Sequence, residues 1–508
     1  MNIQVEKKTA DNFCNTRRPC HRIVLILTVV IACLTCFSCA SLPPGPTDAR
    51  VVMFHFNDVH GKIDNFAKVA AIVEGERRKG ADVLLFCAGD NFTGNPVIDQ
   101  YNPPGEPMLE LLNRLGVDLI TPGNHEFDIG LDKLKQFAAR ARFPFVSANI
   151  HSGTDNFPQL KPSTVLTTKG GVRIAVFGLI QLEPGSGLPS THPDKVKGLR
   201  FSDPLQAALK MSGLRQGNHV FLALSHLGYD MDRILAERIS QLDVIIGAHS
   251  HTRINPAEMV NGVLVAQAGS DNHFLGRVDL RLRNGRVIEK KGTLIDLKNV
   301  NDEDPEVKAM IVRFNKNPAF ARIIAEAPFA IEGKDALGSL MTDAVRQVHG
   351  LDIAFQNGGG IRLNRLNGSI TIMDVFTLDP FGNQVVEIPM TAEEIRSLLR
   401  DSFRKDNAID LQVSGITYTI RTDAQWRIQA VELRGPDDQP LAEDRTFKVG
   451  VSSYVASAYD FKHKDPGRAL NSTTAEALIR FLEGHPDLSI YRGIQRAFQD
   501  PPPPLRSW

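Results

Sequence analysis

Five short polar motifs each follow an apolar run or short strand, and this pattern constrains the fold more than any other feature. They are Asn57-Asp58-Val59-His60-Gly61, Gly89-Asp90-Asn91, Gly123-Asn124-His125-Glu126-Phe127-Asp128, Ser225-His226 and Gly247-Ala248-His249-Ser250-His251. Side chains at the carboxyl ends of neighbouring strands converge in one crevice, where α/β proteins place their sites. Each motif alone is weak, since a lone Asp-x-His is usually a surface turn. The joint occurrence of all five predicts one shared site.

The segments between the motifs predict an α/β fold, because apolar runs alternate with amphipathic helical stretches. Buried strands are expected at 51–56, 83–86, 145–149, 172–179, 220–224 and 244–246, and helices at 65–78, 107–115 and 131–142. We assign 49–300 to a first domain and the charged stretch 301–325 to an interdomain connector. A second α/β domain follows at 326–500, with helices at 336–349 and 392–403 and strands at 352–355, 416–420 and 447–452. Residues 501–508 form a Pro-rich tail.

The N-terminus predicts export. Residues 1–39 carry basic residues and then an apolar stretch at 23–37, as a signal peptide does, and a Pro-rich linker follows at 40–48. The run before Cys33 resembles a bacterial lipobox, with Cys39 as a second candidate, so that Cys33, Cys39 or neither carries a lipid. A single membrane-spanning anchor is the alternative, although spanning needs about 20 apolar residues. We expect a periplasmic or cell-envelope protein whose contact with the membrane, if any, is this lipid.

Composition limits the partners. The 508 residues include 58 Lys+Arg and 58 Asp+Glu, a neutral balance that argues against a broad basic surface for nucleic acid. Five of the six cysteines lie in the first 39 residues, and Cys87 alone cannot form a disulfide within the main body. Oligomeric state is left open by these counts.

The motifs suit transition-metal chemistry. Asp58 and His60 lie on one side of an extended segment because strand side chains alternate, and the same holds for His249 and His251. Imidazole and carboxylate together favour Zn²⁺, Mn²⁺ or Fe²⁺ over Ca²⁺. A carboxylate such as Asp90 can bridge two ions, and ions about 3.5–4 Å apart can hold a hydroxide that attacks a phosphoester.

In this order the motifs resemble those of the calcineurin-like metallophosphoesterases, and the second half resembles that of the 5′-nucleotidase family. The resemblance runs from Val51 to about Glu483. It implies a four-layer α/β/β/α metallophosphoesterase domain followed by an α/β substrate-binding domain. It also implies two divalent ions (Zn, Mn, Co or Fe), held by Asp58, His60, Asp90 and His251 and by Asp90, Asn124, His226 and His249.

The resemblance also assigns a catalytic pair, His125 and Asp128. Their i,i+3 spacing at a helix start lets Asp128 orient the imidazole and keep it protonated, so that it stabilises charge on the phosphoryl oxygens. A carboxylate that only stabilises the helix macrodipole is the alternative role for Asp128.

Substrate-binding residues come from the second half. In Asn357-Gly358-Gly359-Gly360-Ile361-Arg362 the glycines let backbone amides approach an anion, and Arg362 can grip a phosphate. The resemblance assigns substrate contacts to Asn357, Gly359, Gly360 and Arg362, base stacking to Phe381 and Tyr454, and ribose binding to Asp460. The chain departs from the family at Gly333, which takes the place of an arginine with Lys334 adjacent, and this puts the substrate in question.

Together these features predict an exported dimetal phosphohydrolase that converts nucleoside 5′-monophosphates to nucleoside and phosphate. The alternatives on the same site are a 2′,3′-cyclic nucleotide phosphodiesterase, a UDP-sugar hydrolase and a thiosulfohydrolase. A non-catalytic nucleotide-binding surface protein is the alternative from another class, and retention of the full ligand set weighs against it.

Overall fold

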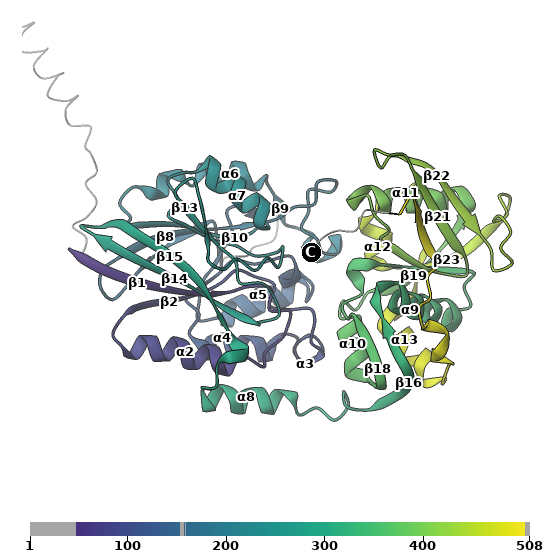
Figure 1. Ribbon diagram of the computed structural model, residues 1–508, viewed down its shortest axis with the longest axis horizontal. Coiled ribbons are helices and arrows are strands. Elements are labelled where there is room, and N and C mark those ends of the chain that lie inside the picture. Colours follow the sequence, from purple (N-terminus) through teal and green to yellow (C-terminus); the bar gives the residue numbers. More distant parts are fainter. Residues whose placement is uncertain (1–46, 153–156, 158, 503–508) are drawn as a thin grey trace, which may run out of the picture.

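Two lobes make up the part of the chain that the computed structural model describes, residues 47–152, 157 and 159–502 (Figure 1). The predicted signal peptide, with Cys33 and Cys39, lies outside the described residues, as does most of the Pro-rich tail. No helix among the described segments is long and apolar enough to cross a membrane.

The first lobe is built on two stacked sheets. The seven-stranded sheet has the order β15-β14-β1-β2-β3-β4-β6, and the six-stranded sheet has the order β12-β13-β11-β10-β8-β7. The strands are β1 (Asp48–Phe56), β2 (Asp82–Cys87), β3 (Leu119–Ile120), β4 (Phe145–Val146), β6 (Leu160–Lys161), β7 (Ser163–Thr167), β8 (Arg173–Ile180), β10 (Val220–His226), β11 (Val244–Ile246), β12 (Glu258–Val260), β13 (Val263–Ala266), β14 (Phe274–Arg283) and β15 (Arg286–Asp296). A separate pair joins β5 (Ile150–His151) to β9 (Arg200–Phe201).

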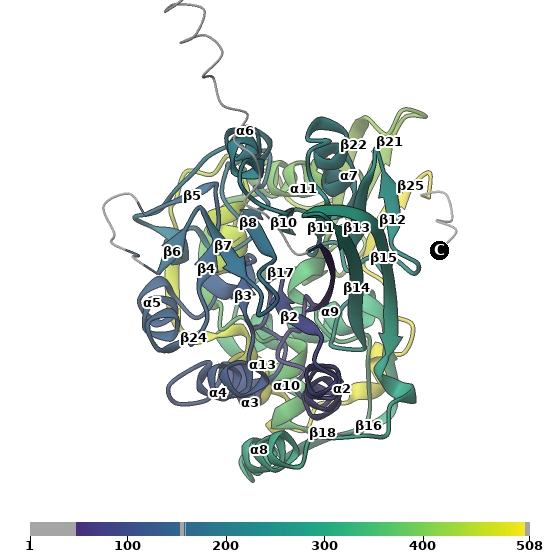
Figure 2. The same ribbon diagram turned by 90° about the vertical axis from the view of Figure 1, so that its left-hand side faces the viewer.

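Helices cover both outer faces of this stack, which gives the lobe four layers. They are α2 (Phe66–Arg78), α3 (Pro96–Asp99), α4 (Glu106–Leu115), α5 (Leu131–Arg140), α6 (Pro204–Lys210) and α7 (Tyr229–Arg238). Figure 2 shows α2 and α4 below the sheets and α6 and α7 above them.

Strand alternation explains the layers. In β1, Val51 and Met53 point to the second sheet, while Phe54 and Phe56 belong to the core under the first helices. The predicted α/β architecture with a second α/β domain is confirmed.

The strand predicted at 145–149 is shorter than expected, since β4 ends at Val146. Beyond it the chain crosses between the sheets. The Ala148 amide donates to the Gly178 carbonyl of the second sheet at 2.7 Å, and the Asn149 side chain donates to the Ile180 carbonyl at 2.8 Å. Residues 147–149 therefore lie outside the strand that the sequence pattern predicted to include them.

The predicted connector contains helix α8 (Pro305–Asn315), which packs against α2 and α4 of the first lobe. Arg114 forms ion pairs with Asp304 at 3.0 Å and Glu306 at 2.7 Å, and these fasten the start of α8. The chain then enters the second lobe at Ile323 (Figure 1).

The second lobe has a five-stranded sheet of order β20-β17-β23-β19-β24, a three-stranded sheet β22-β21-β25 and a pair β16-β18. Its strands are β16 (Ile323–Glu332), β17 (Ile353–Asn357), β18 (Arg365–Thr371), β19 (Gln384–Thr391), β20 (Leu411–Ser414), β21 (Thr417–Thr422), β22 (Ile428–Arg434), β23 (Thr446–Ser452), β24 (Arg468–Thr473) and β25 (Ala497–Asp500). Its helices are α9 (Gly333–His349), α10 (Ile372–Leu378), α11 (Ala392–Asp406), α12 (Ser453–Ala458) and α13 (Thr474–Glu483).

Helix α11 shows how local sequence sets these elements. Thr391 and Glu394 form a reciprocal capping box at its start, which satisfies backbone N–H groups that have no partner inside the helix. Ile395, Leu398 and Leu399 recur at helical spacing and are fully buried against the sheet. The helix therefore begins and packs where the sequence predicts.

Candidate metal centre and interlobe cavity

The seven predicted metal-ligand residues lie together at the carboxyl ends of strands from both sheets of the first lobe. Asp58, His60 and His251 form one group of close potential ligand atoms, and Asp90, His226 and His249 form a second. Within each group these atoms all lie within 4.8 Å of one another. His60, Asp90 and His125 form a further such group, so the site is continuous.

The backbone at this site is strained. Five residues that are not glycine have left-handed φ angles: Asp58 (49°), His60 (47°), Asp90 (56°), His249 (74°) and His251 (56°). Such conformations cost about 1–3 kcal/mol each and persist only where the surroundings hold them. Neighbouring loops supply that support, because the Asp58 amide donates to the Gly89 carbonyl and the His60 amide to the Asp90 carbonyl, both at 3.0 Å.

The donor set fits a divalent cation. Burial lowers the pKa of His249 to about 3 and that of His60 well below its usual range, so both imidazoles are neutral, the form that binds metals. The Asn124 side chain donates from Nδ2 to the Ser190 carbonyl at 3.0 Å, whereas its buried Oδ1 has no hydrogen-bond partner among the described residues. A buried oxygen without a donor is costly, and a cation would satisfy it.

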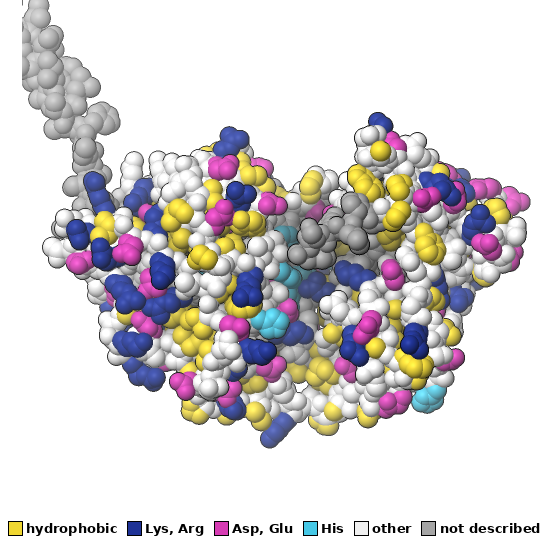
Figure 3. All heavy atoms as spheres, viewed as in Figure 1, with side chains coloured by type: hydrophobic (Ala, Val, Ile, Leu, Met, Phe, Trp, Pro, Cys, Tyr) yellow, Lys and Arg dark blue, Asp and Glu magenta, His cyan; other side chains and the backbone are white. Residues whose placement is uncertain are grey.

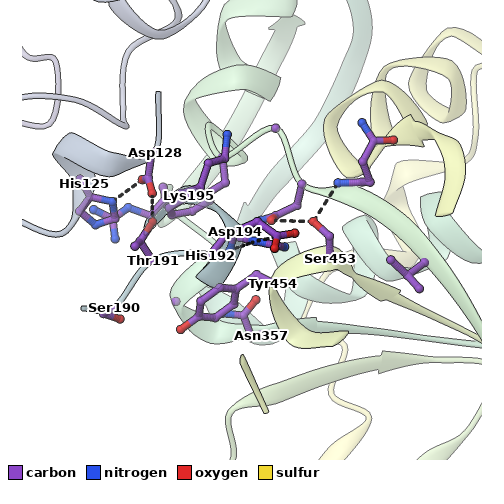
Figure 4. Close-up of a pocket in the computed structure, with 18 of the residues that line it drawn as sticks. His125, Asp128, Ser190, Thr191, His192, Asp194, Lys195, Asn357, Ser453 and Tyr454 are labelled. Carbon is purple, nitrogen blue, oxygen red and sulfur yellow. Dashed lines mark hydrogen bonds and ion pairs between the residues drawn. The ribbon is translucent and has the colours of Figure 1, made fainter. Parts of the chain in front are cut away.

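His125 and Asp128 form a close pair beside these residues. His125 Nδ1 lies 2.6 Å from Asp128 Oδ2, as Figure 4 shows. Burial lowers the pKa of His125, but the Asp90 and Asp128 carboxylates outweigh it and the pKa is raised. The arrangement can hold a protonated imidazole next to the metal-ligand cluster.

Glu126 is a buried residue of the site to which sequence reasoning assigned no role. Its carboxylate accepts from the backbone amides of Asp90 and Asn91, both at 2.8 Å, and of Gly123 at 2.6 Å. It therefore fastens the loop that carries Asp90 to the loop that carries Asn124. The only sequence feature that could have pointed to Glu126 was its position within the third motif, Gly123–Asp128.

The site opens on a cavity of about 530 Å³ between the lobes. Figure 3 shows histidine side chains along the cleft between the lobes, next to basic side chains. Several predicted residues line the cavity, namely His125, Asp128, Asn357, Gly359, Gly360, Arg362, Phe381 and Tyr454. The predicted catalytic pair thus faces both aromatic residues and the glycine loop across one space.

Arg362 brings the second lobe closest to the metal ligands. Its Nη2 lies 3.4 Å from His60 Nδ1, and its guanidinium carbon lies 5.8 Å from the Phe381 ring centre. The Phe381 ring centre is also 5.8 Å from that of His125. Lys334 supports the same loop by donating to the Gly358 carbonyl at 2.9 Å.

Asp460 is the one predicted substrate residue that does not line this cavity. It is exposed, and its backbone amide donates to the Asp401 carboxylate at 2.9 Å. Helix α12 ends at Ala458, and the Tyr459 hydroxyl donates to Asp410, which turns the next side chain towards solvent. The structure therefore does not bring Asp460 to the cavity wall that holds the other predicted substrate residues.

Helix η2 (Pro193–Val196) and the residues before it supply cavity residues that sequence reasoning missed. Five residues of the first lobe line the cavity near Tyr454 (Figure 4), namely Ser190, Thr191, His192, Asp194 and Lys195. No ligand-like motif marks them, because their proximity depends on how the lobes dock.

Comparisons with known proteins agree with this geometry. A model of the calcineurin-like phosphoesterases matches residues 52–253, and a model of the 5′-nucleotidase C-terminal domain matches residues 321–462. The chain is 27% identical to the trifunctional nucleotide phosphoesterase protein YfkN of Bacillus subtilis over 83% of its own length, but it spans only 33% of that relative.

Two relatives match over nearly their full length. The chain is 27% identical to a 5′-nucleotidase of Vibrio parahaemolyticus, with 89% of this chain and 93% of that one covered. The crystal structure of a 5′-nucleotidase precursor from Thermus thermophilus superposes with a TM-score of 0.75 at 26% identity, covering 89% of this chain and 100% of the other. The chain belongs to the 5′-nucleotidase family, in which a calcineurin-like phosphoesterase domain precedes a 5′-nucleotidase C-terminal domain.

Proposed function

We propose that the chain hydrolyses nucleoside 5′-monophosphates to nucleoside and phosphate at a centre that binds two divalent ions. One observation carries this proposal: the His125–Asp128 pair, which adjoins the His/Asp cluster, lines a single cavity together with Phe381, Tyr454 and Arg362. A nucleotide has a phosphate, a ribose and a flat base, and the cavity offers cationic groups for the phosphate and aromatic rings for the base.

The metal-ligand roles are as the family resemblance implies. Asp58, His60, Asp90 and His251 would hold one ion, and Asp90, Asn124, His226 and His249 the other; the three-member groups of close ligand atoms support this division. When bound, the ions supply Lewis acidity and a water made acidic enough to act as a nucleophile near neutral pH.

The chain's own residues would orient the substrate and stabilise charge. His125, kept protonated by Asp128, donates to a phosphoryl oxygen as negative charge develops there. Arg362 and the amides of the glycine loop grip the same phosphate, and a planar guanidinium suits this task. Phe381 and Tyr454 would stack on the base, at roughly 1–3 kcal/mol per stacked base.

Movement between the lobes would admit the substrate. We place the two domains at 49–300 and 326–500, as the sequence predicts, with the hinge in the connector. Because α8 is packed on the first lobe, the bending segment would be the short stretch 316–322 between α8 and β16.

The decisive experiment is phosphate release from a panel of nucleoside monophosphates, cyclic nucleotides and UDP-glucose, with Mn²⁺, Zn²⁺, Co²⁺ and Mg²⁺ compared. The proposal expects nucleoside monophosphates to have the highest kcat/KM, and expects Asp90→Asn to abolish turnover and reduce bound metal. Preference for another phosphoester would replace the substrate assignment. Full activity of Asp90→Asn would overturn the metal mechanism.

We further propose that the protein is exported and anchored to the cell envelope by a lipid on Cys33 or Cys39. The basic and apolar composition of residues 1–39 supports this proposal. Mass spectrometry of the mature N-terminus should show a diacyl-modified cysteine. A cleaved terminus without lipid would indicate a soluble periplasmic protein.

A further inference from the structure

Three consecutive residues of the first lobe, Ser190, Thr191 and His192, contact three different parts of the candidate site. The segment lies between β8 and η2, is not marked by any motif and lines the interlobe cavity. Thr191 is buried, with 5% of its surface exposed. The contacts of each residue indicate what the segment does.

Thr191 completes the surroundings of Asp128. The Asp128 carboxylate has one oxygen, Oδ2, that accepts from Thr93 Oγ1 at 2.7 Å and pairs with His125 Nδ1 at 2.6 Å. The other oxygen, Oδ1, accepts from Thr191 Oγ1 at 2.7 Å (Figure 4). Two anchored oxygens prevent rotation of the carboxylate, and the carboxylate in turn sets the plane of the His125 ring.

Ser190 contacts a candidate metal ligand. Its carbonyl accepts from Asn124 Nδ2 at 3.0 Å, which leaves Asn124 Oδ1 free to face a cation. Its side chain lines the same cavity as Tyr454 of the second lobe. The same residue therefore contacts Asn124 and lies in the cavity wall together with Tyr454.

His192 fastens the segment to helix α12 of the second lobe. Its Nε2 lies 3.2 Å from Ser457 Oγ, and both His192 and Ser453 line the cavity. Figure 4 shows His192 beside Ser453 and Tyr454. The position of α12 is thereby linked, through the single peptide unit between His192 and Thr191, to the carboxylate of Asp128.

We propose that the segment Ser190–His192 transmits docking of the second lobe to the catalytic pair, with Thr191 as the positioning residue for Asp128 and His125. The proposal rests on the proposed function, since it assumes that the pair acts at phosphorus. A second lobe carrying substrate docks α12 against His192, the segment is held, and Thr191 fixes the carboxylate. Hydrolysis is then favoured only when the second lobe, which carries the proposed base-stacking residues, is docked.

The test compares Thr191→Val, which removes the hydroxyl at nearly constant shape, with Thr191→Ser, which keeps it, and with Thr167→Val on an exposed strand position as control. Loss of an outer partner of a catalytic group typically costs roughly 10- to 100-fold in activity. We expect Thr191→Val to lower kcat by that factor with KM and bound metal unchanged, and Thr191→Ser and Thr167→Val to stay near wild type.

A double-mutant cycle tests the path. If Thr191 acts through His125, Thr191→Val should have no further effect in a His125→Ala background. If α12 acts through Thr191, Ser457→Ala should lower kcat by roughly 2- to 10-fold alone, as expected for one hydrogen bond, and have no effect in a Thr191→Val background.

Additive losses in either cycle would overturn the proposal, as would failure of Thr191→Ser to restore turnover or loss of metal from Thr191→Val. The wild-type substrate panel separates this inference from the proposed function. If the protein hydrolyses another phosphoester instead of nucleotides, the cycle is measured with that substrate. His125 and Asp128 would act at phosphorus in either case.

Discussion

Replacing Glu126 by glutamine tests whether one buried carboxylate holds the metal-binding loops together. Both oxygens are used: Oε2 accepts from the Asp90 and Gly123 amides, and Oε1 accepts from the Asn91 amide and from Asn91 Nδ2 at 2.9 Å. Glutamine offers one oxygen in place of two. Its NH₂ group would face two donors that it cannot satisfy.

The expected loss of stability follows from the number of donors left without an acceptor. Two buried N–H groups lose their acceptor, and each such loss costs about 1–3 kcal/mol, so Glu126→Gln should destabilise the first lobe by roughly 2–6 kcal/mol. The loops that carry Asp90 and Asn124 should loosen together, and the affinity for a divalent ion should fall with them. Burial and then the nearby Asp90 carboxylate raise the pKa of Glu126, so the comparison belongs at the alkaline end of the range in which the protein is folded.

Amide hydrogen exchange on the metal-free protein is the suitable assay, because a two-lobe chain need not unfold in a single step. Residues 89–91 and 121–124 should exchange faster in Glu126→Gln. Glu74→Gln is the matched control, since Glu74 only pairs with Arg77 on the surface of α2, where one ion pair contributes about 0–1 kcal/mol. A loss below 1 kcal/mol, or unchanged exchange at these loops with unchanged metal affinity, would refute the reasoning.

Three further predictions concern the glycine beside the metal ligands, the phosphate grip and the pH dependence of stability. Gly123→Ala should abolish metal binding, because a β-carbon there would lie 2.2 Å from Asp90 Oδ1; Gly75→Ala in open space on α2 should keep the metal and raise stability by about 0.5–1 kcal/mol. Arg362→Ala should lower kcat/KM about 10- to 100-fold with bound metal unchanged, measured by steady-state kinetics and elemental analysis; unchanged kinetics would exclude it as the phosphate grip. Burial raises the pKa of Asp379 from 3.8 to about 6, so the folded state binds this proton more tightly than the unfolded state. Stability should therefore fall by about 2 kcal/mol as pH rises from 4 to 6, and Asp379→Asn should flatten that part of the urea-denaturation profile.

Much of the candidate site could be predicted from the sequence because several of its residues occupy the same kind of position, at or just after the end of a strand. His226 ends β10, Asp58 and Asp90 lie shortly after the ends of β1 and β2, and parallel strands bring their carboxyl ends to one edge. The order of the motifs along the chain then sufficed to group the ligands. The α/β class followed for the same reason, since apolar periodicity is a local property.

Spacing along the chain does not fix an orientation that depends on packing. Asp460 stands six residues after Tyr454, yet it is exposed; α12 ends two residues earlier and Tyr459 is fastened to Asp410. The stretch 145–149 likewise leaves the first sheet after Val146, and the Ala148 amide finds its acceptor, the Gly178 carbonyl, on the second sheet.

The sequence by itself determined that this chain forms an α/β fold with a cluster of imidazoles and carboxylates at strand ends. Only the tertiary structure decided that Glu126 joins the loops of Asp90 and Asn124, and that Thr191 and His192 connect the predicted catalytic pair to the second lobe. These contacts join residues that are distant in sequence or lie in different lobes. They arise from the docking of whole elements, and no local pattern of residue types records where a docked surface will find its partner.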